Sequence, residues 1–285
     1  MEMRRSIFLT VALTVAFLIG GLLSSCATDS GSEDGEFHVT SEVVSHEASR
    51  DMLVFAPDVE GPWPIVVAFH GIGGTGQDMA EIATRLAREG SVVFVPTYET
   101  DITTQEGVDR AAVDAECGYR FARSIAAEYG GDLDQPVTFV GWSLGASAAL
   151  GVGLTEEIDP TGEFVSCFDQ VPRPDNIVAI SGCHYEGGQL DLVDTEAWGN
   201  KEADIFLLAG EKDTNCPAWE TEDAADEMRS AGYEVDLLML DGADHFAPVF
   251  HDLQDGQSVV VANDPAGERT VEVILDAIAA RQHRT

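Results

Sequence analysis

The sequence predicts an α/β fold, a mostly parallel sheet of about eight strands with helices on both faces. Short runs rich in β-branched residues alternate with amphipathic helical patterns along the chain. Several of these runs are continuously apolar over four to six residues, which is typical of strands covered on both faces of a parallel sheet. The chain has 285 residues, of which 45% are hydrophobic, and this is enough apolar content to build one large core.

Eight segments have the pattern expected of strands. They are His38–Ser45, Met52–Ala56, Ile65–Phe69, Val92–Pro96, Val137–Val140, Asn176–Ile180, Ile205–Ala209 and Val235–Leu240. No helical pattern separates the first two, so we expect them to form an antiparallel hairpin at the start of the sheet. The later strands alternate with helices, and this alternation favours parallel pairing.

Five segments between the strands have helical periodicity. They are Gly76–Glu89, Val108–Tyr129, Leu144–Leu154, Glu220–Ala231 and Gly267–Arg281. In Val108–Tyr129 the apolar residues recur close to every 3.6 positions, which predicts a half-buried helix. No internal repeat and no break in composition divides residues 37–285, so we expect them to form one domain.

The first 25 residues differ from the rest of the chain. Arg4 and Arg5 precede an uncharged, mostly apolar run from Ile7 to Leu23, the layout of a secretory signal, and this run is shorter than the roughly 20 residues of a membrane-spanning helix. Its Leu-Ser-Ser-Cys26 ending resembles the lipobox of bacterial lipoproteins. The resemblance implies cleavage of residues 1–25 and acylation of Cys26, which would attach the protein to the lipid bilayer. An ordinary signal peptide and an uncleaved anchor are the alternatives.

Residues 26–36 are small and acidic and lack apolar periodicity, so they predict a flexible tether between the anchor and the domain. We expect an exported protein, lipid-anchored at the cell surface or on the outer side of the cytoplasmic membrane. The chain has 15 Lys and Arg against 51 Asp and Glu, a formal net charge of −36. A field this negative repels nucleic acid, which argues against DNA or RNA as a partner.

One strand leads directly into a helix through Gly141-Trp-Ser-Leu-Gly145. A serine nucleophile needs a sharp turn that lifts its hydroxyl off the sheet, and flanking glycines permit the close packing that this turn requires. The pattern therefore predicts that Ser143 is a nucleophile. The alternative is a simple turn in which Ser143 caps the helix.

With this motif the chain resembles the α/β-hydrolase fold serine hydrolases, which include esterases and dienelactone-hydrolase-like enzymes. The resemblance implies that an acid and a histidine follow the serine in chain order, each after a later strand. Gly210-Glu-Lys-Asp213 and Asp241-Gly-Ala-Asp-His245 occupy these two places, which makes Asp213 the acid and His245 the base. Glu211 is the rival acid, and His251 is the rival base.

The three side chains form one chemical unit. A serine hydroxyl is a weak nucleophile at neutral pH, so a neutral imidazole must accept its proton, and a carboxylate must orient that imidazole. The resemblance also implies an oxyanion hole, which we assign to the backbone N–H groups of Ile72 and Leu144, with Gly73 as the alternative to Ile72. A plain glycine-rich turn is the simpler interpretation of His70–Gly74.

The connections from Leu154 to Asn176 and from Gly182 to Ile205 have only about twenty residues each, so we expect no large lid and an open site. Trp142 and Phe246 are our candidates for lining the substrate site. Four further residues, each more simply explained by packing, are weaker candidates for its walls: His184, Tyr185, Trp198 and Trp219.

Besides Cys26 the chain has four cysteines, an even number that permits two disulfides in an exported protein. Their spacing leaves three pairings open, and the absence of a Cys-x-x-Cys pair argues against a metal site. Cys183 ends a predicted strand, and Cys216 lies three residues beyond Asp213, so both should lie at the carboxyl edge of neighbouring strands. Our hypothesis is a Cys183–Cys216 disulfide, which leaves Cys117 with Cys167.

The sequence therefore predicts an exported serine hydrolase that cleaves carboxylic esters through an acyl-enzyme and needs no cofactor. Its substrate would be a small or polymer-bound ester. A peptidase, a thioesterase or a dienelactone-type hydrolase would use the same three residues. A non-catalytic surface lipoprotein with a hydrolase fold is the alternative from a different class.

Overall fold

The computed structural model describes residues 36–45, 50–156, 167, 171–184, 198–254 and 257–283. The predicted signal peptide, Cys26, nearly all of the predicted tether and Tyr185 lie outside these residues. Within the described ranges, no helix has the length and apolar character needed to cross a membrane.

In this part of the chain, eight strands form one sheet in the order β1-β2-β4-β3-β5-β6-β7-β8. Their bounds are β1 Val39–Ser45, β2 Asp51–Pro57, β3 Ile65–Phe69, β4 Val92–Pro96, β5 Val137–Trp142, β6 Asn176–Ile180, β7 Asp204–Gly210 and β8 Val235–Leu240. β2 pairs antiparallel with both β1 and β4, and all other neighbours are parallel. The predicted opening hairpin and parallel sheet are confirmed.

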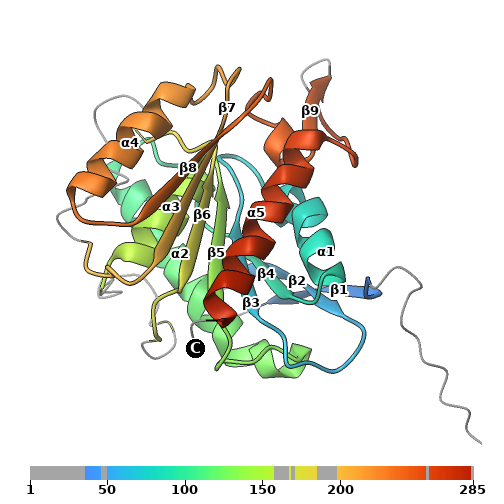
Figure 1. The fold of residues 1–285 in the computed structure, drawn as a ribbon. Coiled ribbons are helices and arrows are strands. Elements are labelled where there is room, and N and C mark those ends of the chain that lie inside the picture. The colour runs from blue at the N-terminus through green and yellow to red at the C-terminus, as the bar shows by residue number, and fades with distance from the viewer. Residues whose placement is uncertain are drawn as a thin grey trace, which may run out of the picture. The chain divides into compact units, whose positions relative to one another are not determined.

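Helices cover both faces of the sheet. They are α1 Ala80–Arg88, α2 Gln105–Ile125, α3 Leu144–Leu154, α4 Ala218–Ser230 and α5 Pro265–Gln282. Figure 1 shows α1 and α5 on one face and α2, α3 and α4 on the other. Short 3₁₀ turns precede α1 at Gly76–Met79 and follow α2 at Ala126–Tyr129, so the two predicted helical segments there are each divided in two.

The sheet separates two hydrophobic clusters, because successive side chains of a strand point to opposite faces. One cluster contains Phe69, Phe139 and Leu150 and lies under α2, α3 and α4. The other contains Val140 and Trp142 and packs against α1 and α5. The central strands β3, β4, β5 and β6 are buried along their whole length, which explains why their sequences lack polar residues at alternate positions.

The structure contains a hairpin that the sequence pattern did not predict. β9, His251–Gln254, pairs antiparallel with β10, Gln257–Val260. His251 is buried, but most other residues of the hairpin are exposed, with Leu253 at 46% and Val260 at 54%, so no alternating apolar pattern marks these strands.

Both disulfides of our hypothesis are present among the described residues. Cys117 pairs with Cys167 at a Cα–Cα distance of 5.2 Å, and Cys183 pairs with Cys216 at 4.7 Å. The second bond joins the loop after β6 to the loop after β7. It therefore connects two neighbouring strand ends at the carboxyl edge of the sheet.

Candidate active site

Ser143 lies at the turn between β5 and α3 in a strained backbone conformation. Its φ is 57° and its ψ is −121°, a region that a non-glycine residue adopts only when the surrounding structure imposes it. Its backbone N–H donates to the carbonyl of Ile180 at 2.9 Å, and its carbonyl accepts from the N–H of Ala146 at 2.9 Å. These bonds fix the turn, which has the geometry of a nucleophile elbow.

The two glycines of the motif allow this turn to close. A Cβ atom added at Gly141 would collide with the carbonyl of Gly145, and one added at Gly145 would collide with the carbonyl of Phe69 at the end of β3. Glycine is therefore required at both positions by the close approach of three backbone segments. This packing also brings the loop after β3 against the elbow.

Asp213 and His245 meet in the buried space beyond β7 and β8. His245 Nδ1 donates to Asp213 Oδ2 at 2.7 Å, and the two side chains are only 7% and 0% exposed. Because the carboxylate accepts the Nδ1 proton, the neutral ring keeps its lone pair on Nε2. This is the tautomer that a general base for a serine hydroxyl needs.

The loop after β7 holds Asp213 in place through its second oxygen. Asp213 Oδ1 accepts backbone N–H groups from Asn215 at 2.8 Å and from Cys216 at 2.9 Å. Cys216 is also bonded to Cys183, so the disulfide restrains one of the two donors that position the carboxylate. The rival acid, Glu211, is exposed and accepts the N–H of Gly242 at 3.3 Å instead.

The rival base, His251, is engaged at both ring nitrogens. Its Nε2 donates to the carbonyl of Asp78 at 3.0 Å, and its Nδ1 accepts from the hydroxyl of Ser258 at 2.7 Å. No ring nitrogen therefore remains for the hydroxyl of Ser143. His251 instead connects the β9–β10 hairpin to the segment before α1.

The backbone N–H groups proposed for the oxyanion hole lie on either side of the elbow. Leu144 is the first residue of α3, so its N–H has no acceptor within the helix. Gly71 packs against the side chains of Trp142 and Ser143, which places the next residue, Ile72, beside the elbow. The N–H of the alternative donor, Gly73, is taken by Thr100 Oγ1 at 3.2 Å. This contact favours Ile72 over Gly73.

The side chains of His70 and Tyr98 hydrogen-bond to backbone carbonyls of the loop after β3. The ring Nδ1 of His70 donates to the carbonyl of Gly71 at 2.9 Å, and the hydroxyl of Tyr98 donates to the carbonyl of His70. Burial lowers the pKa of His70, which keeps its ring neutral. Sequence reasoning did not identify Tyr98 as part of the site, because only the packing of β4 beside β3 brings it there.

Trp142 is a packing residue of the site. Its side chain belongs to the buried cluster on the α1 and α5 face, and its indole Nε1 donates to the carbonyl of His245 at 2.8 Å. Phe246 packs against the rings of both Trp142 and His245, at centroid distances of 5.6 and 5.2 Å. Among the weaker candidates for the walls, His184 is buried and Trp219 is 53% exposed.

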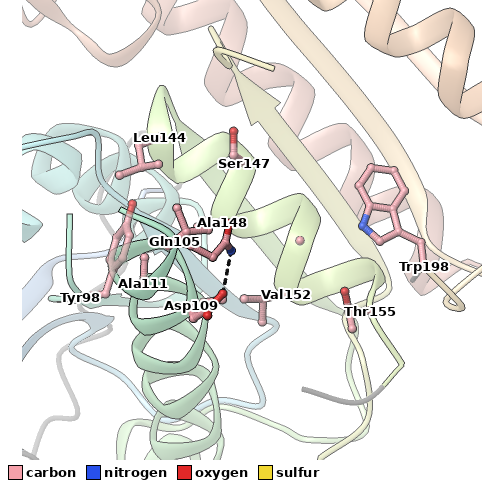
Figure 2. A pocket seen from close by; sticks show the side chains of 13 residues that line it. Tyr98, Gln105, Asp109, Ala111, Leu144, Ser147, Ala148, Val152, Thr155 and Trp198 are labelled. Carbon is pink, nitrogen blue, oxygen red and sulfur yellow. Dashed lines mark hydrogen bonds between the residues drawn. The ribbon is translucent and has the colours of Figure 1, made fainter. Parts of the chain in front are cut away.

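A cavity of about 200 Å³ lies beside the elbow, between α2 and α3 (Figure 2). Leu144 and Tyr98 line it, and Trp198, one of the weaker candidates, lines it next to Thr155. Trp142 and Phe246, our two candidates for lining the substrate site, are not among its lining residues. In the described part of the chain, no cluster of His, Cys, Asp or Glu side chains is arranged to hold a metal ion.

Two family models match separate parts of the chain. The model of the dienelactone hydrolase family matches residues 51–149, which contain Ser143 and the loop after β3. The model of the prolyl oligopeptidase family matches residues 189–255, which contain Asp213 and His245. A comparison with curated proteins gave no match.

Solved structures share the fold at low sequence identity. A thermophilic esterase from the Planctomycetes species Thermogutta terrifontis, with propionate bound, is 18% identical with a TM-score of 0.63, over 84% of this chain and 94% of that chain. Esterase B from Lactobacillus rhamnosis HN001 is 14% identical with a TM-score of 0.65, over 86% of this chain and 87% of that chain. The sheet order, the elbow and these similarities establish that the chain has the α/β-hydrolase fold.

Proposed function

We propose that this protein is a serine hydrolase that cleaves carboxylic esters through an acyl-enzyme. The observation that carries the proposal is the 2.7 Å hydrogen bond from His245 Nδ1 to Asp213 Oδ2, at the sheet edge where the strained Ser143 turn lies. Burial of all three residues strengthens their electrostatic interactions, because little water screens them. The esterases and the dienelactone hydrolase model that the chain resembles support an ester as substrate.

In the acylation step, Ser143 Oγ attacks the ester carbonyl carbon and its proton moves to His245 Nε2. The carbonyl oxygen becomes an oxyanion, which the N–H groups of Leu144 and Ile72 stabilise. The carbon–oxygen bond to the alcohol then breaks as His245 gives its proton to the departing oxygen. Asp213 stabilises the imidazolium that exists between these two proton transfers.

In the deacylation step, a water molecule gives a proton to His245 Nε2 and attacks the acyl carbon. The bond to Ser143 Oγ breaks, and His245 returns the proton to that oxygen. The products are a carboxylic acid and an alcohol, and the enzyme returns to its starting state. A single preorganised oxyanion donor contributes about 3 to 4 kcal/mol to such reactions.

Hydrolysis of p-nitrophenyl acetate and butyrate by the domain from residue 37 onward would test the proposal. We expect Ser143→Ala to abolish turnover and labelling by a fluorophosphonate, and Ser124→Ala, a change at an exposed serine of α2, to leave both intact. Absence of ester hydrolysis and of labelling in the wild type would reject the proposal in favour of a non-catalytic binding protein.

A peptidase is the second candidate, and the match of residues 189–255 to the prolyl oligopeptidase family favours it. The same triad would then attack an amide, and His245 would protonate an amine. Peptidyl p-nitroanilides distinguish the two functions. We expect the protein to cleave esters much faster than these amides, and the reverse ranking would make it a peptidase.

We also propose that the protein is exported and held at a lipid bilayer by an acylated Cys26. The support within the described residues is the pair of disulfides, because such bonds persist in oxidising compartments outside the cytosol. Globomycin treatment of expressing cells would test the anchor, since it blocks cleavage of lipoprotein signals. We expect the precursor to accumulate, whereas a Cys26→Ala variant should not carry lipid.

A further inference from the structure

The cavity between α2 and α3 begins next to the candidate nucleophile. Leu144, which lines it, directly follows Ser143, and its backbone N–H is one of the two assigned oxyanion donors. Figure 2 shows Leu144 and Tyr98 near one end of the cavity and Trp198 with Thr155 at the other. A substituent of the substrate's carbonyl carbon that points toward Leu144 can therefore enter this cavity.

The cavity and the indole of Trp142, which contacts the histidine loop, are on opposite faces of the sheet. Leu144 and Tyr98 belong to the cluster under α2, α3 and α4, whereas Trp142, which binds the carbonyl of His245, belongs to the cluster under α1 and α5. The leaving alcohol must lie near His245, because that residue protonates it. The acyl group, which stays on Ser143, is consequently directed to the other side, where the cavity lies.

The size of the cavity limits the group that fits. A cavity of about 150 Å³ lined by apolar side chains binds a benzene molecule in another protein. The cavity here, at about 200 Å³, accommodates one six-membered ring or a chain of comparable volume. Its walls include Val108 and Ala148, so most of its surface is apolar.

We propose that this cavity binds the acyl group of the substrate, and that this group is about the size of a single aromatic ring. The inference rests on the proposed ester hydrolysis and specifies its substrate class. Ala148 lines the cavity and limits its volume. It is a specificity residue, because it does not touch the reacting atoms.

The test compares kcat/KM for p-nitrophenyl acetate, benzoate and naphthoate. We expect the wild type to prefer the benzoate to the larger naphthoate. Ala148→Leu places three more carbons in the cavity and should lower kcat/KM for the benzoate by at least about tenfold, while acetate changes by less than about threefold.

A matched control is Ala280→Leu, the same substitution at an exposed position of α5 on the opposite face of the sheet, which should alter no ratio. If Ala148→Leu fails to fold, Val108→Ala tests the same cavity by enlarging it and should raise kcat/KM for a naphthoate relative to benzoate. Unchanged acyl preferences in these variants, with acetate still hydrolysed, would overturn the inference alone. Failure of the wild type to hydrolyse any ester, including acetate, would reject the proposed function and this inference together.

Discussion

The indole Nε1 of Trp142 donates a 2.8 Å hydrogen bond to the backbone carbonyl of His245. Trp142 immediately precedes Ser143, so this bond connects the nucleophile turn directly to the histidine loop, 103 residues later in the chain. The indole also lies parallel to the ring of His251, at a centroid distance of 6.5 Å and an interplanar angle of 8°. The turn of the candidate nucleophile and the loop of the candidate base are therefore connected by one aromatic residue.

Replacement of Trp142 by Phe should lower kcat for ester hydrolysis by about tenfold. Phe keeps one aromatic ring but is smaller than the indole and has no N–H, so the carbonyl of His245 loses its buried donor, at a cost of about 1 to 3 kcal/mol. Without this bond His245 is held less firmly, and a small displacement of its ring lowers kcat. Steady-state kinetics on p-nitrophenyl acetate, with a thermal melt of the same sample, would measure both effects.

Trp63→Phe is the matched control for this change. Trp63 Nε1 also donates to a backbone carbonyl, that of Val59 at 3.3 Å, but at an exposed place away from the strand ends that carry the candidate triad. We expect its kcat to equal that of the wild type. Equal kcat in both variants would show that the Trp142 bond contributes to stability only.

Loss of the Cys183–Cys216 disulfide should reduce activity more than loss of the Cys117–Cys167 disulfide. Cys216 donates its backbone N–H to Asp213 Oδ1, so a Cys183→Ser variant frees one of the donors that hold the acid. We expect kcat to fall by between about 10- and 100-fold. Kinetics of folded, purified variants would measure it.

The control is Cys117→Ser, since the Cys117–Cys167 bond links α2 to a segment that contributes no triad residue. Both variants should lose a few kcal/mol of stability, because each disulfide restrains the unfolded chain. If the two variants retain the same kcat, then the disulfide does not position Asp213.

The central strands were predictable from the sequence because burial on both faces leaves them continuously apolar. β3, β4 and β6 coincide with the predicted segments. The edge strand β8 also coincides with its predicted segment, although it is only partly buried. Helix starts were less accurate. α2 begins at Gln105, where the side chain of Thr104 accepts the N–H of Gly107, three residues before the apolar periodicity begins. The first turn of α2 is polar, so the apolar periodicity did not reveal where the helix begins.

Within the site, the sequence motifs indicated Ser143, Asp213 and His245 as candidates, and the structure brings Asp213 and His245 together, but no motif indicated the contacts that support these residues. The Trp142–His245 bond, the Tyr98–His70 bond and the cavity beside Leu144 each join segments that are distant in the chain. No local pattern encodes such contacts, because they depend on strand order in the sheet. The elimination of His251 likewise required the hydrogen bonds to Asp78 and Ser258.

Replacement of Glu116 by Leu should destabilise the fold by about 3 to 5 kcal/mol. Its carboxylate is 1% exposed and accepts hydrogen bonds from Arg120 at 2.6 Å and Arg173 at 2.7 Å. Removal of the Glu116 carboxylate takes this counter-ion away from two largely buried guanidinium groups. Loss of one partner from a buried ion pair typically destabilises a fold by about 3 to 5 kcal/mol. Urea denaturation at neutral pH would measure the change.

The corresponding exposed pair provides the control. Glu106 binds Arg110 at 3.0 Å on the same helix, with side chains 74% and 38% exposed. Glu106→Leu should change stability by less than about 1 kcal/mol, because water already screens this pair. Leu and Glu have similar helix propensities, so a loss as large as that of Glu116→Leu would contradict the attribution of the effect to burial of the ion pair.

Burial of His184 should make the fold less stable in mild acid. Burial lowers the pKa of this residue to about 4, from an ordinary value of 6.5. Between these two values the unfolded chain binds a proton that the folded chain does not, so the contribution to stability is complete above pH 6.5 and is lost as the pH falls toward 4. The full loss is on the order of 3 kcal/mol.

His184→Gln cannot bind this proton, so its urea denaturation midpoint should fall less between pH 7 and pH 4.5 than that of the wild type. The many carboxylates titrate in both proteins and cancel in the comparison. The exposed His283→Gln should follow the wild type, and equal pH dependence in all three proteins would show that His184 takes up no proton on unfolding.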